Sequence, residues 1–493
     1  MKTPGFPNLL PLLKKVAQKF SKKLVISPPG AIMTQTENEG GNFVAKRNSL
    51  DMTQGPVLRK LLVFAFPLMF SAIVNTFYHM ADKVIAGQFI GPNAMAAVGA
   101  SGPLLNLIIN FFVGVGAGVA VLCGNYIGSR NQKAVRECVY TAPIVGLLFG
   151  LMVTVIGLVF DGPMLRATGT PNELFSDALL YMNIRMSCAP LELCNNFCIG
   201  VLTAHGDTKR ITVSGLISGL VNLVGNVVFV TVIPLGIAGI ALSTNLSILT
   251  GLIIKIVIFF SPKDNYKLKL SEMKLHWVHA KKMIAIGLPS GLNNVVFNIS
   301  NVLLQSSVNS FGSVVMAGNS AADTVAEFVW AFPSQLAAAC SCAAAQCFGA
   351  HKIRRIDEVM KKGIFSNTVA VLLSCALVTV FANPVMNLFV EDPAVATAGI
   401  PKLMFCVWGY AIYGISLIYA GALRGIQKTV FPMVINIGAI CLPRVLWVWF
   451  VFPSFHTATM LYLIYPLSWT FSAVLMAIAY YRARRNLLAI HAA

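Results

Sequence analysis

Acidic side chains inside long apolar stretches are the residues of this sequence with the clearest chemical meaning. Asp82 lies near the end of one stretch, and Asp323 and Glu327 lie four residues apart in another, so these two share a helix face. A carboxylate inside a bilayer costs about 2.5 kcal/mol or more, so each position is by default a functional site. The chemistry open to them is the binding of a cation or a proton. For Asp82 the alternative is an interfacial acid that pairs with Lys83.

Three more charged residues lie in apolar stretches. Arg185 and Glu192 are seven residues apart on one helix face, and Arg444 lies in a stretch near the C-terminus. We expect Asp323 and Glu327 to form a proton site or cationic-substrate site in the C-terminal half. The alternative is a structural ion pair of these acids with Arg444, because an unpaired buried charge is costly.

The composition indicates which elements position these residues. Apolar residues make up 56% of the sequence and charged residues 11%, whereas a soluble protein carries about 25% charged residues. Apolar stretches of about 20 residues or more form helices in a membrane, because barrel strands need only about ten residues of alternating polarity. The sequence therefore predicts an all-α integral membrane protein with twelve transmembrane helices. The predicted spans are 57–81, 94–122, 139–160, 176–204, 210–231, 236–260, 283–308, 313–340, 363–389, 397–422, 429–452 and 458–481.

Lysine and arginine are distributed unevenly along the chain, whose formal net charge is +19. They gather near the termini and in every second connection, whereas the intervening connections hold only Lys83, Arg166 and Lys402. Under the positive-inside rule both termini are cytoplasmic, in a multi-pass protein of the bacterial inner membrane. An even number of spans requires the same result. The charge therefore reflects topology, and we expect no nucleic-acid partner.

The same pattern predicts the domain boundaries. Residues 6–26 form a basic amphipathic stretch suited to the anionic inner leaflet, and we expect no cleaved signal peptide. Met33 and Met52 are alternative starting residues that the sequence leaves open. The linker between the two halves, residues 261–282, is either a hinge strap or a solvated loop. The predicted divisions are a cytoplasmic tail at 1–56, a six-helix bundle at 57–260, a cytoplasmic linker at 261–282, a second six-helix bundle at 283–481 and a cytoplasmic tail at 482–493.

The two bundles are internal repeats. Residues 128–138 (GSRNQKAVREC) correspond to residues 349–359 (GAHKIRRIDEV) at an offset of 221, and Pro67 corresponds to Pro289 at an offset of 222. Six spans per repeat give both repeats the same orientation. We therefore expect two parallel six-helix repeats related by a pseudo-twofold axis along the membrane normal, with substrate bound between them.

Several of these landmarks resemble the MATE (multidrug and toxic compound extrusion) family, within a larger flippase-like superfamily. The resemblance rests on the order and spacing of motifs across residues 57–481. It implies a cation-coupled antiporter, driven by Na⁺ or H⁺, that exports drugs and other bulky, often cationic and amphipathic compounds by alternating access. The motifs are NTFYHMADKVIAGQFIGPNAMAAVG (75–99), YIGSRNQKAV (126–135), AHGDTK (204–209), GIAGIALSTN (236–245), GLPSGLN (287–293) and FGAHKIRRIDEV (348–359).

The resemblance also implies a coupling-ion site. It places the coupling cation, a proton or a sodium ion, at Asp82, and completes the site with Asn222, Asn226 and Thr244. A rise of about 1.5 Å per residue puts these residues in the outer half of their spans, so a shared site is feasible. Relatives with a well-formed sodium site have Asp in place of Asn226, so its absence weakens the case for Na⁺ and leaves H⁺ open. The alternative role of the two asparagines is interhelical hydrogen bonding.

Aromatic residues of the C-terminal half are candidates for the substrate cavity. Phe328, Trp330 and Tyr413 could stack on flat cations. The alternative is that these side chains pack in the bundle or face lipid.

Other function classes fit the sequence less well. A lipid-linked saccharide flippase of the same superfamily is the main alternative, although such proteins often have about fourteen spans. A membrane-embedded enzyme or an ATP-driven pump is disfavoured, because the sequence has no HExxH, GxSxG or phosphate-binding glycine motif. The eleven cysteines lie in the spans or within a few residues of a span end and are expected to pack as small apolar residues. We expect a monomer with a small organic substrate, and no cofactor apart from the coupling ion.

Overall fold

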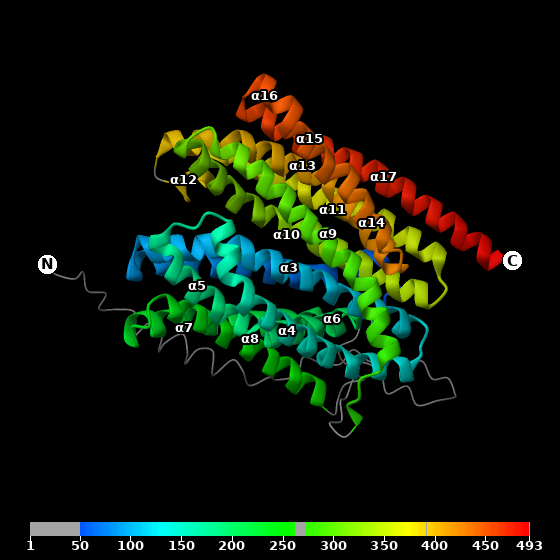
Figure 1. Ribbon diagram of the computed structural model, residues 1–493. Helices are drawn as coiled ribbons and strands as arrows, with labels where there is room; N and C mark the ends of the chain where they lie inside the picture. Colours follow the sequence, from blue (N-terminus) through cyan, green and yellow to red (C-terminus); the bar gives the residue numbers. More distant parts are fainter. Residues whose placement is uncertain (1–49, 262–271, 391, 493) are drawn as a thin grey trace, which may run out of the picture. The chain divides into compact units, whose positions relative to one another are not determined.

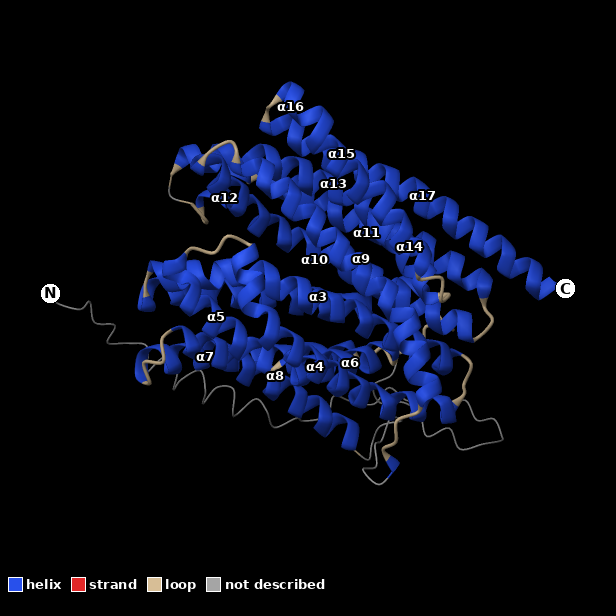
Figure 2. Cartoon of the chain, in the orientation of Figure 1, coloured by secondary structure: helices blue, strands red, loops and turns tan. Residues whose placement is uncertain are grey.

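The computed structural model describes residues 50–261, 272–390 and 392–492 (Figure 1). Within these ranges the protein is built of helices and has no strand, which confirms the predicted all-α class (Figure 2). The amphipathic stretch predicted at residues 6–26, and residues 262–271 of the predicted linker, lie outside the described residues, whereas the end of that linker, from Trp277 on, belongs to α9.

The helices divide into an N lobe and a C lobe. The helices of the N lobe are α2 (Val57–Ile85), α3 (Pro92–Gly128), α4 (Gln132–Ala167), α5 (Asn172–Ser187), α6 (Ala189–Ala204), α7 (Thr208–Val227) and α8 (Ile237–Phe260). The helices of the C lobe are α9 (Trp277–Asn309), α10 (Ser313–Gly349), α11 (Ile353–Val380), α12 (Ala382–Asn387), α13 (Pro393–Gly425), α14 (Val430–Asn436), α15 (Leu442–Leu446), α16 (Phe452–Phe455) and α17 (Ala458–Ala492).

Ten helical stretches of the described chain are long and apolar enough to cross a membrane. The fourth predicted span is continuous in the sequence, but the structure breaks it at Cys188 into α5 and α6, which have 16 residues each. The seventh predicted span corresponds to α9, which has 33 residues, includes two lysines and is not among these ten stretches. Large apolar side chains point outward, among them Phe66 (72% exposed) and Val232 (70%). Exposed apolar surface of this kind is suited to lipid rather than water.

The backbone repeats itself at the ends of corresponding helices. Arg130 and His351, which are 221 residues apart, both adopt positive φ angles, of 55° and 56°. Gly206 and Gln427 are separated by the same offset and have φ angles of 73° and 62°. Non-glycine residues seldom adopt this conformation, so its recurrence at one offset confirms the internal duplication.

The two lobes meet through equivalent elements. The second helix of each repeat packs against the first helix of the other, since α3 contacts α9 and α10 contacts α2. Where α3 meets α10, Gly128 lies against Gln346 and Gly349 lies against Asn125. Each pair becomes the other when the repeats are exchanged, because Asn125 and Gln346 are also 221 residues apart. This reciprocity confirms the pseudo-twofold relation between the repeats.

Four glycines, Gly114 and Gly118 of α3 and Gly287 and Gly291 of α9, form what we call the glycine seam. A methyl group on Gly118 would lie 2.4 Å from the carbonyl oxygen of Met283, and one on Gly287 would lie 2.3 Å from that of Val115. Glycine spaced four residues apart on both helices allows the two backbones to touch. The seam lies in the half of each helix next to the basic end of the bundle, which is the end with loops 129–131, 205–207 and 350–352.

The segment that precedes α2 joins the lobes at the basic end. The Leu50 amide donates a hydrogen bond to the His205 carbonyl of the N lobe (2.9 Å). The Met52 amide donates to Gln346 Oε1 of the C lobe (2.8 Å), and Arg355 Nε donates to the Met52 carbonyl (2.9 Å). The start of the helical bundle is therefore bonded to both lobes.

The three basic residues assigned to the sparsely charged side are not in connections. Lys83 lies in α2, Arg166 in α4 and Lys402 in α13. Lys402 is moreover only 4% exposed. The prediction that they lie in connections is wrong. Helices α2 and α4, of 29 and 36 residues, continue past the apolar windows from which their spans were read, and Lys402 falls within the predicted span 397–422 itself.

Candidate coupling-ion site

The structure brings together all four residues that the resemblance placed in one site. Asp82 of α2 accepts a hydrogen bond from Asn226 Nδ2 of α7, and Asn226 Oδ1 accepts one from Ser243 Oγ of α8. Asn222 Nδ2 donates to Thr244 Oγ1 across 3.3 Å. Asp82 is 8% exposed and Asn226 is fully buried. We call these five residues the N-lobe cluster, and their role in ion binding stays a prediction.

Two glycines and two π-helical segments position the N-lobe cluster. Gly219 lies directly against the Tyr78 ring of α2, and Gly225 lies against Ser243 of α8, so α7 approaches both partners closely. A π-helical segment follows each key residue: Ala86–Ile90 after Asp82 and Val228–Val232 after Asn226. Such segments weaken the regular helical hydrogen bonding and are frequent at functional sites.

A second polar group adjoins the N-lobe cluster. Arg185 donates to Glu192 Oε2 at 3.1 Å and to Asn245 Oδ1 at 2.7 Å, and it is 6% exposed. The predicted shared face of Arg185 and Glu192 is thus preserved across the break at Cys188. Asn245 follows Thr244 in α8, which connects this group to the N-lobe cluster along the chain. Sequence reasoning missed both Ser243 and Asn245, because neighbouring residues of a helix point in different directions and only Thr244 matched the family.

Asp323 of the C lobe pairs with Lys402 and not with Arg444, which the sequence analysis considered as its partner. Lys402 Nζ lies 2.6 Å from Asp323 Oδ2, and Asn319 donates to the same oxygen at 3.5 Å. The alternative that Asp323 pairs with Arg444 is therefore wrong, because Lys402 of α13 faces Asp323 and Arg444 is turned towards other groups. The Asp323 side chain is 51% exposed and that of Lys402 is 5% exposed. Glu327 lies one turn further along the same exposed face of α10.

This pair leads to a stability prediction. Asp323→Asn leaves the buried Lys402 ammonium without its carboxylate, so we expect the free energy of unfolding to fall by about 1–3 kcal/mol, less than for a fully buried pair. Lys402→Met in the same chain removes the stranded charge and should recover most of the loss. Thermal unfolding of the purified single and double variants measures both effects. A double variant no more stable than Asp323→Asn would contradict this assignment.

The three aromatic candidates separate in space. Trp330 and Tyr413 stack at 5.6 Å between ring centres, and Trp469 of α17 stacks on Tyr413 at 5.2 Å. Phe328 instead meets Phe77 of α2 at 5.0 Å, across the contact between the lobes. Trp330 and Tyr413 thus belong to an aromatic core of the C lobe, whereas Phe328 belongs to the space between the lobes.

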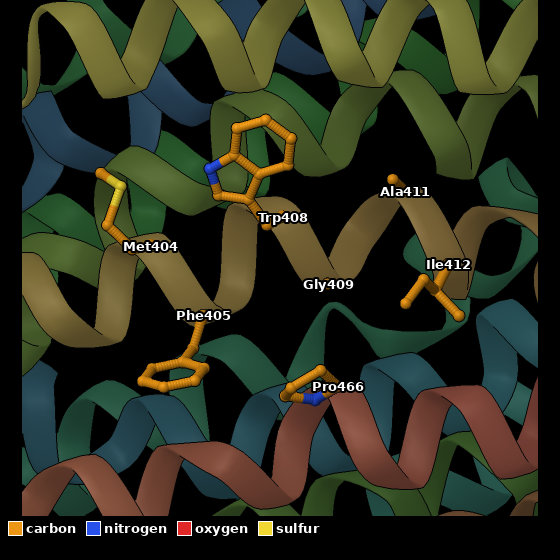
Figure 3. Close-up of a pocket in the computed structure, with 7 residues that line it drawn as sticks. All are labelled: Met404, Phe405, Trp408, Gly409, Ala411, Ile412 and Pro466. Carbon is orange, nitrogen blue, oxygen red and sulfur yellow. The ribbon is translucent and has the colours of Figure 1, made fainter.

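An apolar groove of about 520 Å³ lies between α13 and α17 of the C lobe. In Figure 3, Phe405 of α13 and Pro466 of α17 project toward each other across it. No charged side chain lines this groove, so it is separate from both ionisable groups described above. The lining residues are Met404, Phe405, Trp408, Gly409, Ala411, Ile412 and Pro466.

Two buried charged residues escaped the sequence analysis. Asp161 of α4 is fully buried, and neither carboxylate oxygen accepts a hydrogen bond from the described residues. Lys255 of α8 is 3% exposed and donates to the Gly251 carbonyl at 3.2 Å. Asp161 directly follows a predicted span, whereas Lys255 interrupts one and was a signal that should have been used.

The binding of Na⁺ at Asp82 stays a prediction. No group of three His, Cys, Asp or Glu side chains is arranged to hold a metal ion in the described part of the chain. All eleven cysteines are buried and free, as their positions in or near the spans predicted. The candidate ion site therefore consists of one carboxylate surrounded by amide and hydroxyl groups.

Comparison with known proteins identifies the family. The family model named MatE matches residues 67–228 and again residues 289–449, well over half of the chain and once in each repeat. The chain belongs to the MATE family. It is thus a multi-pass membrane transporter, and membership in a transporter family disfavours an enzyme.

Individual relatives are distant but cover most of the chain. The chain is 26% identical to "Probable multidrug resistance protein YoeA" of Bacillus subtilis, over 78% of this chain and 84% of that protein. It is 22% identical to "Probable multidrug resistance protein NorM" of Thermotoga maritima, over 79% and 85%. Its fold matches a solved structure described as the outward-facing conformation of a multidrug resistance MATE family transporter, with a TM-score of 0.81, 20% identity and coverage of 90% and 99%. This MATE fold has twelve spanning helices in two repeats, in agreement with the predicted fold class.

Proposed function

We propose that this MATE protein exports amphipathic drugs and toxic organic compounds in exchange for a cation that enters at Asp82. The N-lobe cluster is the observation that supports this proposal most, because it buries one carboxylate in a ring of oxygen-bearing side chains within a membrane helix bundle. The names of the relatives, two of them multidrug resistance proteins, support the substrate class. One chain contains both lobes, so a monomer suffices, and nothing in the twelve-helix fold favours the flippase alternative.

We propose H⁺ as the coupling ion. The Asn226 amide nitrogen already meets Asp82, and the Ser243 hydroxyl already meets Asn226 Oδ1, so the polar atoms satisfy one another without a metal ion. A proton on Asp82 needs no additional oxygen ligands, whereas Na⁺ would require these side chains to turn their oxygens inward. This chain has Asn226 where sodium-binding relatives have a second carboxylate, and this difference also favours H⁺.

The place where the lobes touch supports the proposal of alternating access. The glycine seam closes the basic end, which is predicted to be cytoplasmic, and this arrangement corresponds to an outward-facing state. In the proposed cycle, protonation of Asp82 weakens its contact with Asn226 and lets α2 repack at the π-helical segment that follows it. Substrate leaves outward, the seam then opens, and the proton is released inward.

An added carboxylate tests the choice of ion. Asn226→Asp places a second negative charge beside Asp82, so we expect an Na⁺ gradient alone to drive export in this variant and not in the wild type. The assay is uptake of a cationic dye into inside-out vesicles with Na⁺ and pH gradients imposed separately. Asn226→Ala, which removes the amide and adds no charge, is the matched control and should gain no Na⁺ dependence. Export by the wild type under an Na⁺ gradient alone would refute proton coupling, and no export under either gradient would refute the function.

A further inference from the structure

We infer that the C lobe contains an anion-binding site built on Arg444, which takes a carboxylate or phosphate group attached to a flat aromatic ring. The inference deepens the proposed transport function and rests on it. Arg444 is 1% exposed and is among the largest fully buried side chains of the described chain. A guanidinium stays charged in proteins, so this position is a fixed positive charge in the interior of the lobe.

The hydrogen-bond partners that the structure gives Arg444 among the described residues are uncharged. The side chain donates from Nη1 to Asn301 Oδ1 at 2.7 Å and to Ser300 Oγ at 3.4 Å, which are both neutral groups. Asp323 is held by Lys402. The Nε and Nη2 atoms of Arg444 have no hydrogen-bond acceptor in the part of the chain that the structure describes. These two nitrogens form the edge of the guanidinium fork that binds carboxylate or phosphate with two parallel hydrogen bonds.

Aromatic rings surround the guanidinium. Its central carbon lies 4.9 Å from the Tyr465 ring centre, 5.2 Å from that of Phe297 and 5.9 Å from that of Trp469. Ring faces attract a buried cation but offer no lone pair to its unpaired N–H groups. Tyr413 lies 1° from parallel to Phe297 and 16° from parallel to Trp469, so flat surfaces are stacked beside the charge. The site therefore combines an anion partner with walls for a planar ring.

The backbone around Arg444 is unusual and can rearrange. Arg444 lies in the five-residue helix α15, which has a π-helical segment on each side, Ile437–Cys441 and Trp447–Val451. Pro443 precedes it and has no amide hydrogen to donate. A ligand can reach Arg444 only if the rings move apart. Two π-helical segments and one proline within residues 437–451 make this stretch of helix able to rearrange.

The repeat symmetry relates the position of Arg444 to that of the N-lobe cluster. At the offset of 221 that relates Gly206 to Gln427 and the ends of the MatE matches at residues 228 and 449, Arg444 corresponds to Leu223, the residue next to Asn222 in α7. Asn222 belongs to the N-lobe cluster between α2, α7 and α8, and Arg444 lies among the equivalent helices α9, α15 and α17. Equivalent places in the two lobes thus hold a carboxylate cluster and a fixed cation. The N lobe is suited to a cation and the C lobe to an anion.

Two xanthene dyes test the inference. Fluorescein carries a carboxylate, whereas rhodamine 6G has the same ring system, an ester in place of the acid, and a positive charge. We expect Arg444→Met to reduce proteoliposome transport of fluorescein by about tenfold or more and to change rhodamine 6G transport less than about twofold. Arg444→Lys, which keeps the charge but not the fork, should retain an intermediate rate for fluorescein.

Each outcome of this experiment has a distinct meaning. Equal loss of both dyes, or no change in either, would overturn the anion site, while failure of the wild type to move either dye would contradict the proposed export function instead. A measurement on the wild type covers the case in which the variants do not fold. Benzoate should inhibit fluorescein transport and the neutral benzamide should not, and equal inhibition by the two would also overturn the site.

Discussion

Asp82→Asn abolishes proton-driven export while the protein stays folded and still binds substrate. The amide has nearly the shape of the carboxyl group and can still hydrogen bond to Asn226, but it cannot take up a proton. Because coupling requires that protonation favour one state over the other, we expect accumulation against a gradient to fall by about tenfold or more. The measurement is dye accumulation in inside-out vesicles energised with a pH gradient.

The matched control for this substitution is Asp161→Asn. Asp161 is also a fully buried acid of the N lobe, but it has no polar cluster around it among the described residues. We expect this variant to retain wild-type accumulation within about twofold. Equal losses in both variants would mean that any buried acid of this lobe affects folding or packing, and the special role of Asp82 would be lost.

Gly118→Leu should shift the transporter away from the state described here. The first carbon of the new side chain would already lie 2.4 Å from the Met283 carbonyl oxygen, so the glycine seam cannot close around it. Overpacking of this kind costs about 1–3 kcal/mol, which is enough to reverse a closely balanced equilibrium. We expect export to be lost and the basic end to open. Labelling of a Ser290→Cys reporter, which lies at the seam, by a membrane-impermeant maleimide measures the opening.

Gly99→Leu is the control on the same helix. A methyl group on Gly99 has no atom within 4 Å, so α3 tolerates the larger side chain there without moving its neighbours. We expect the Ser290→Cys reporter to stay protected in this variant and to react several-fold faster in Gly118→Leu. A reporter that stays protected in Gly118→Leu would show that the glycine seam does not control access from the basic end.

The sequence predicted the N-lobe cluster because two kinds of information agreed. Helical rise places Asp82, Asn226 and Thr244 at similar depths, and the family resemblance selects the helices that meet there. Neither source predicts how each helix is rotated about its own axis, and this rotation decides which neighbour a side chain faces. Asp323 could therefore be placed on α10 but not matched to its partner, and Lys402 was assigned to a connection although it faces the interior.

Other features of the site depend on contacts between different helices, which the periodicity of apolar residues does not predict. The break at Cys188 leaves Arg185 and Glu192 paired. Pro190, in the first turn of α6, was a sequence signal of this break that should have been used, although both short helices continue the same apolar pattern. The surroundings of Arg444 were equally hidden, since its neighbours come from α9, which is far away in the chain, and from α17. Sequence reasoning named an acid as a possible partner of Arg444 only as an alternative, and the structure has Asn301 and aromatic rings there.

Proton flux in purified proteoliposomes tests the central claim, that the coupling ion enters at Asp82, most directly. With a pH-sensitive dye trapped inside and no other gradient imposed, a substrate gradient should drive proton movement in the opposite direction in the wild type. The proposed site predicts that Asp82→Asn eliminates this flux while Asp161→Asn retains it. Substrate-dependent proton flux of equal size in Asp82→Asn would contradict the assignment of the coupling site to the N-lobe cluster.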